Sequence, residues 1–141
     1  MNLYLDTSAL VKLFVAEPGS AEVKRRCRQA SVVVTSRVAY PEARAAFARR
    51  CRDGSLSPHE SRRAASDLDR DFARFVVAEL TGSVVHLAGE LAERHALRGF
   101  DAIHLASAVE FGQMVGTPPR FLCFDDRLAS AAAAERLDGW S

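Results

Sequence analysis

Short apolar runs alternate with longer segments whose apolar residues recur at helical spacing, from one end of the chain to the other. The runs predict strands at residues 2–6, 31–36, 75–80 and 121–124. The longer segments predict helices at residues 7–16, 19–30, 38–52, 57–70, 82–97, 100–115 and 126–137. Because this alternation is typical of helices packed against a parallel sheet, the expected fold class is α/β, with a mostly parallel sheet and helices on both faces.

The size and composition of the chain favour one globular domain, residues 1–141, without repeats or linkers. No apolar run approaches the roughly 18 residues of a membrane span, and the start lacks a secretory signal pattern, so we expect a cytoplasmic protein with no membrane contact. The three cysteines are odd in number and lack CxxC spacing, which argues against a disulfide framework or a thiolate metal site.

Charge is unevenly distributed although the net charge is only +1. Residues 1–65 carry 12 basic and 6 acidic side chains, whereas residues 66–141 carry 7 and 12. Basic clusters lie at residues 24–28, 49–52 and 62–63. Such clusters suit a polyanion such as nucleic acid, but arginines on exposed helix faces often contact only solvent. Charge alone leaves both interpretations open.

Two predicted strands end in an aspartate that directly precedes a predicted helix. Asp6 follows the first strand, and Asp125 follows the last, with Asp126 next to it. Since the carboxyl ends of parallel strands meet at one edge of a sheet, we expect Asp6 and Asp125 to face the same crevice. The alternative is that each aspartate only caps the helix that follows it.

Two further acids stand near predicted helix starts. Glu42 lies early in the helix after the second strand, and therefore at the same edge of the sheet. Asp101 lies early in helix 100–115, which follows another helix, so topology alone does not place it. As alternatives, Asp101 could only complement the helix dipole, and Glu42 could pair with Arg44 or Arg49 on the surface.

Four carboxylates at one edge would repel one another unless a cation neutralised them. Hard oxygen ligands without a supporting set of Cys or His residues indicate Mg²⁺ or Mn²⁺. His104 lies three residues after Asp101, on the same helical face. We expect it to pack beneath the site, with a water-mediated contact to the metal as the alternative.

Four stretches of the chain together resemble the PIN-domain family and, within it, the VapC-type toxins of prokaryotic toxin–antitoxin pairs. They are LYLDTSALVKLF, the glutamate of SRVAYPEARAAFARR, LRGFDAIHLASA and FLCFDDRLASAA, in that order. The resemblance implies a PIN-like three-layer α/β/α sandwich with four or five short strands. It also implies an acidic crevice in which a water activated by Mg²⁺ or Mn²⁺ hydrolyses RNA phosphodiester bonds.

Matched motif by motif, the resemblance assigns metal binding and catalysis to Asp6, Glu42, Asp101 and Asp125. Ser8 matches a hydroxyl that supports the first aspartate. Asp126 departs from the family pattern, and it would replace Asp125 as the fourth acid if the strand ended one residue later. Pro41, directly before the glutamate, is a second departure.

The expected partners are an RNA substrate, a cognate VapB-type antitoxin and a second copy of the chain in a homodimer. Arg44, Arg49 and Arg127 are the candidate contacts to RNA phosphates. Two other functions remain open: a catalytically silent PIN-like module that binds RNA or protein, and an aspartyl phospho-acceptor domain. The second would need a further acid at the first strand, where the chain has Asp-Thr-Ser.

Overall fold

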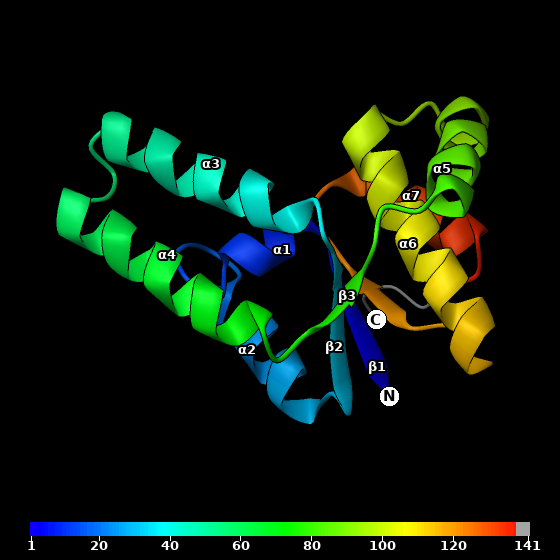
Figure 1. Ribbon diagram of the computed structural model, residues 1–141, viewed down its shortest axis with the longest axis horizontal. Helices are drawn as coiled ribbons and strands as arrows, with labels where there is room; N and C mark the ends of the chain where they lie inside the picture. Colours follow the sequence, from blue (N-terminus) through cyan, green and yellow to red (C-terminus); the bar gives the residue numbers. More distant parts are fainter. Residues whose placement is uncertain (138–141) are drawn as a thin grey trace.

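The centre of the protein is a sheet of four parallel strands (Figure 1). The structure is a computed structural model that describes residues 1–137; the predicted domain end at residue 141 lies outside the described residues. The strands are β1 (Asn2–Leu5), β2 (Val32–Ser36), β3 (Val76–Ala78) and β4 (Arg120–Leu122), in the spatial order β3-β2-β1-β4. Every neighbouring pair is parallel, so the predicted α/β class with a parallel sheet is confirmed.

Each predicted helix is present among the described residues. The helices are α1 (Thr7–Val11), α2 (Ser20–Gln29), α3 (Ala39–Arg52), α4 (Pro58–Phe72), α5 (Gly82–His95), α6 (Gly99–Val115) and α7 (Asp126–Ala134). Pro41 lies in the first turn of α3, where its missing N–H leaves no helical hydrogen bond unmade. Within the described residues, none of the helices has the length and apolar character needed to cross a bilayer.

Several elements are shorter than their apolar patterns predict: β3 covers Val76–Ala78 of the predicted 75–80, α7 covers Asp126–Ala134 of the predicted 126–137, and α1 and β4 also end early. Helix α1 ends at Val11 because the following amides bond to carbonyls three residues back, in tight turns that end the regular helix. Strand β4 ends at Leu122, two residues early, because the chain then turns toward α1: the Phe124 amide donates to Ser8 Oγ at 3.2 Å instead of continuing the ladder.

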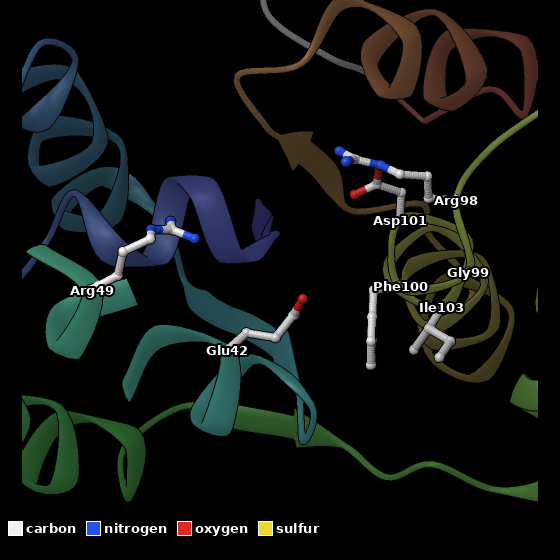
Figure 2. Close-up of a pocket in the computed structure, with 7 residues that line it drawn as sticks. All are labelled: Glu42, Arg49, Arg98, Gly99, Phe100, Asp101 and Ile103. Carbon is white, nitrogen blue, oxygen red and sulfur yellow. The ribbon is translucent and has the colours of Figure 1, made fainter. Parts of the chain in front are cut away.

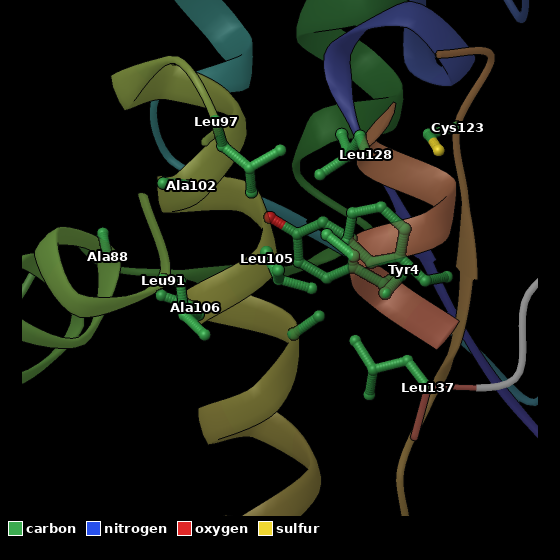
Figure 3. Close-up of a cluster of buried hydrophobic side chains, with 14 of the residues drawn as sticks. Tyr4, Ala88, Leu91, Leu97, Ala102, Leu105, Ala106, Cys123, Leu128 and Leu137 are labelled. Atoms are coloured by element: carbon green, nitrogen blue, oxygen red, sulfur yellow. The ribbon is translucent and has the colours of Figure 1, made fainter. Parts of the chain in front are cut away.

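Strand β1 separates two hydrophobic cores because its side chains alternate between the faces of the sheet. Leu3 and Leu5 join the core formed with α1–α4, whereas Tyr4 joins the core formed with α5, α6 and α7. Figure 3 shows Tyr4 among Leu105 of α6 and Leu128 of α7. The two cores, one on each face, complete the predicted α/β/α sandwich.

The loop between α1 and α2 packs against the segment that follows β4. Gly19 has φ of 97°, and a Cβ added there would lie 2.9 Å from the Phe124 ring. The Lys12 ammonium lies 4.5 Å from the centre of the same ring and pairs with Glu17 at 2.9 Å. This contact braces the connection from β4 to α7, which carries Asp125.

We expect Gly19→Ala to destabilise the fold by more than Gly54→Ala. Both glycines have positive φ, so each substitution carries a backbone cost of roughly 1 kcal/mol, but only Gly19 also faces a side-chain clash. Urea unfolding of the two variants and the wild type measures the difference. Equal losses of stability would show that the loop yields without cost and that the Phe124 contact does not constrain it.

Candidate active site

Asp6 is a buried carboxylate at the junction of β1 and α1. Its amide donates to the Leu122 carbonyl at 3.2 Å, so the residue continues the pairing of β1 with β4. Its side chain is the N-cap of α1: Oδ1 accepts from Ser8 Oγ at 2.7 Å and from the Ala9 amide at 2.9 Å. The capping role considered from the sequence is therefore present, with Ser8 as a second donor.

Burial raises the pKa of Asp6 above its ordinary value, and the negative charge of Asp101 raises it further. His104 and the two hydrogen bonds act in the opposite direction without reversing the shift of this pKa. The residue is only 4% exposed. An ionised Asp6 therefore gains strongly from any cation that reaches it.

Glu42 is anchored by a hydrogen-bond network that passes through α1, α6 and β1. Its Oε1 accepts from the Thr7 hydroxyl and lies 3.1 Å from His104 Nε2. His104 Nε2 is also 2.9 Å from Thr7 Oγ1, and its Nδ1 is 2.9 Å from the Tyr4 hydroxyl. The sequence did not assign Thr7 or Tyr4 to the site, and it predicted that His104 would pack beneath the site. The structure adds a direct contact from His104 to Glu42.

The hydrogens of this network can be assigned by counting donors. Thr7 has one hydroxyl hydrogen, which it donates to Glu42, so the His104 Nε2–H is shared between Thr7 Oγ1 and Glu42 Oε1. Although burial raises the pKa of Glu42, the bonds from His104 and Thr7 outweigh it and leave the pKa below its ordinary value. Glu42 is thus held in its ionised form.

Glu42 and Asp101 line one open cleft of about 750 Å³ between the N-terminal parts of α3 and α6. Figure 2 shows them on facing sides of this space. The other residues that line it are Arg49, Arg98, Gly99, Phe100 and Ile103. Asp101 lies in the first turn of α6, where its Oδ2 is 3.6 Å from Arg98 Nε. Helix α6 packs against β2, and its His104 contacts Tyr4 of β1, so tertiary packing supplies the placement of Asp101 that topology alone did not.

Asp125 and Asp126 lie at the start of α7 and both are exposed. Asp125 is the N-cap, and it accepts from the Leu128 amide at 2.8 Å. Burial is the main cause that raises the pKa of Cys123 to about 12, and the charges of Asp6, Asp125 and Asp101 add to it. Asp126 instead lines a separate pocket with His95. Neither of the two is among the residues that line the cleft of Glu42 and Asp101.

The oxygen donors present suit a hydrated hard cation. Within residues 1–137, no three His, Cys, Asp or Glu side chains lie close enough together to enclose an ion. The charge of Asp101 nevertheless raises the pKa of Asp6, and Glu42 faces Asp101 across the cleft. Mg²⁺ usually keeps several waters and binds through one or two carboxylates, so this donor set fits it without a complete protein cage.

The three arginines predicted to contact phosphate lie in different places. Arg49 lines the acidic cleft. Arg44 donates to the Tyr40 hydroxyl at 2.7 Å and lines a separate groove between α3 and α4. Arg127 donates to the Ala96 carbonyl at 3.2 Å. Arg98, which sequence patterns did not single out, lies in the acidic cleft beside Asp101. Its only sequence signal is its position three residues before that acid.

A family model described as the PIN domain matches residues 3–134. The chain belongs to the PIN-domain family. Ribonuclease VapC49 of Mycobacterium tuberculosis is 43% identical over 114 residues, which cover 78% of this chain and 76% of the relative. The predicted resemblance to VapC-type members is thereby confirmed.

Solved structures share the fold of this PIN domain. VapC20 of Mycobacterium tuberculosis, a toxin that cleaves the sarcin-ricin loop, matches with a TM-score of 0.68 and 22% identity, over 92% of this chain and 94% of that one. VapBC2 of Rickettsia felis, bound to a DNA fragment from its promoter, matches with a TM-score of 0.62 and 12% identity over 100% of both chains.

Thr7→Val should destabilise this PIN domain by about 1–2 kcal/mol, because it removes the donor to Glu42 and leaves His104 Nε2–H without its hydroxyl acceptor. Thr7→Ser keeps the hydroxyl and should stay close to the wild type. Thermal unfolding in EDTA compares the three proteins. A double-mutant cycle with Glu42→Gln isolates the pair. A coupling energy of zero would show that the Thr7 hydroxyl does not hold Glu42.

Proposed function

We propose that this PIN domain is a Mg²⁺- or Mn²⁺-dependent endoribonuclease and the toxin of a VapBC-type pair. The observation that carries the proposal is the buried Asp6 carboxylate, with the charge of Asp101 acting on it and with ionised Glu42 on the facing side of the cleft formed with Asp101. The ribonuclease name of a relative that is 43% identical supports the reaction class.

Asp6 and Asp101 are the residues that would hold the ion directly, and Glu42 and Asp125 would act through waters. When bound, the ion supplies a water of lowered pKa and polarises a phosphoryl oxygen. The chain's own contribution is to place the acids on rigid elements and to hold Glu42 ionised. Both donors to Glu42 bind its Oε1, so Oε2 is the oxygen that can orient a water in the cleft.

The substrate would reach the acids along the basic rim of the cleft. Arg49 on α3 and Arg98 before α6 flank the carboxylates and can contact phosphates on either side of the bond that is cut (Figure 2). Arg44 and Arg127 lie farther from the cleft lining and would contact more distant phosphates. A single strand suits an open cleft of this kind better than a duplex, whose bases are covered.

We also propose a VapB-type antitoxin as the partner, a homodimer as the assembly state and the cytoplasm as the site of action. The match to VapBC2 over its whole length supports the antitoxin. A groove between α3 and α4, lined by Tyr40, Pro41 and Phe47 among others, offers apolar surface next to the helix that carries Glu42. A segment bound there would reach the cleft from its α3 side.

Asp6→Asn and Asp101→Asn should each lower RNA cleavage at least about 100-fold while the fold stays intact or becomes slightly more stable. Asparagine Oδ1 can still accept from Ser8 and the Ala9 amide, and each change relieves carboxylate repulsion. Cleavage of end-labelled cellular RNA and thermal unfolding in EDTA measure the two effects. Wild-type cleavage by Asp101→Asn protein would contradict the assignment.

A matched pair of variants identifies the fourth acid: Asp125→Asn should weaken cleavage, whereas Asp126→Asn should not.

Mn²⁺ titration by calorimetry tests metal binding without a cleavage assay. If the wild type bound no Mn²⁺ or Mg²⁺ near millimolar concentration, the proposed enzyme function would be wrong, and a catalytically silent module that binds RNA or protein would be favoured.

Light scattering after size-exclusion chromatography should give twice the monomer mass for the chain alone.

Co-expression with the small protein encoded next to it should give a stable complex that no longer cleaves RNA, because that protein covers the cleft. A monomeric chain would refute the homodimer. Full cleavage by the purified complex would refute the antitoxin assignment.

A further inference from the structure

Phe100 is an exposed aromatic side chain in the wall of the acidic cleft. It lies in the first turn of α6, directly before Asp101, and is 57% exposed. Among the described residues it belongs to neither hydrophobic core. Figure 2 shows its ring extending from α6 into the space that separates α6 from α3, with Glu42 on the other side. Packing therefore does not account for an aromatic ring at this position.

The chemistry around the ring is that of a nucleotide site. The cleft holds an aromatic face, the cations of Arg49 and Arg98, and two carboxylates. Arg98 is largely exposed and extends beside Asp101, so its guanidinium can contact a phosphate there. The carboxylates favour a divalent ion and, through it, a phosphodiester. An aromatic face next to that position can accept the base of the same or the adjoining nucleotide.

We infer that Phe100 is a stacking platform for one unpaired nucleobase next to the scissile phosphate. The inference rests on the proposed ribonuclease function and adds a residue that selects the substrate. Bases in a duplex have both faces covered by their neighbours, so only an unstacked base can lie on the ring. Ile103, in the same wall, extends the apolar surface beside it.

Stacking on an aromatic ring tolerates any base, because each base has a π-face. Phe100 would therefore select for an unpaired conformation more than for a particular letter. The same arrangement explains why an apolar ring is useful in a cleft that otherwise carries charge. A protein partner could also cover the ring, but the juxtaposition with the acids and the two arginines favours a nucleotide.

The test compares Phe100→Ala, Phe100→Leu and Phe100→Trp in an Asp6→Asn background, so that RNA is bound without being cut. Fluorescence anisotropy with a labelled single-stranded RNA should show about 5- to 150-fold weaker binding for Phe100→Ala. Phe100→Leu should remain weak, because it restores apolar volume without a π-face, and Phe100→Trp should bind as well as Phe100 or better. Met114→Ala is the matched control: Met114 is 83% exposed near the other end of the same helix.

RNA probes with one abasic position supply a readout that a merely structural role would not move. With Phe100 present, one abasic position near the cleavage point should weaken binding. With Phe100→Ala, intact and abasic RNA should bind equally, because no stack remains to be lost. In protein that retains Asp6 and can cleave RNA, Phe100→Ala should raise KM and leave kcat and the affinity for Mn²⁺ near the wild-type values.

Unchanged RNA affinity in Phe100→Ala protein would overturn the inference, and a weakened antitoxin complex in the same variant would assign the ring to the protein partner instead. This result is distinguishable from failure of the proposed function. If the protein bound the probes but cut no RNA, the comparison of intact with abasic RNA would still report on the ring; if the wild type bound no RNA at all, both the proposed function and the inference would be refuted.

Discussion

Parallel pairing of β1 with β2 on one side and with β4 on the other is the constraint on which the site depends. It buries β1 on both faces and delivers Asp6, the residue directly after it, to the edge where the other strands also end. The amide of Asp6 is itself bonded to Leu122, so the carboxylate is positioned by sheet pairing and not by a mobile loop. Tyr4, two residues earlier, reaches the opposite core and meets His104 there.

The buried Asp6 and the cleft residue Glu42 are placed in opposite electrostatic environments. Burial and the negative charge of Asp101 raise the pKa of Asp6. Hydrogen bonds from His104 and Thr7 instead lower the pKa of Glu42. The first is a charge in need of a cation, and the second stays ionised without one. This difference is what the proposed roles require, in which Asp6 holds an ion and Glu42 orients a water. The difference comes from neighbours on β1, α1 and α6.

Most of the architecture could be predicted from the sequence, because alternation of apolar runs and helical segments reflects the physical requirement that each element bury one surface. The ends of α1 and β4 could not, since local hydrogen bonds such as Phe124 to Ser8 decide them. Strand direction predicted that Asp6 and Asp125 would both follow strands at the same edge of the sheet, and their positions after β1 and β4 agree with this. Asp101 needed the packing of α6, and the direct contact of His104 with Glu42 appears only when β1, α1 and α6 come together.

Side-chain detail on exposed helix faces was the least predictable part. Arg44 donates a hydrogen bond to the Tyr40 hydroxyl. Arg49 lies about one and a half turns later on the same helix and lines the cleft. Phe100 begins a helix that is apolar on nearly every side, so periodicity cannot tell which of its residues faces water.

The pairing of the first strand with the last has a consequence for synthesis of the protein. β1 is translated before the other strands of the sheet, yet one of its two neighbours, β4, is translated after all of them. Until Arg120–Leu122 has been made, Asp6 lacks the carbonyl that anchors its amide, and the start of α7 with Asp125 does not exist. A nascent chain is thus unable to complete the pairing on both sides of β1 until all four strands have been translated.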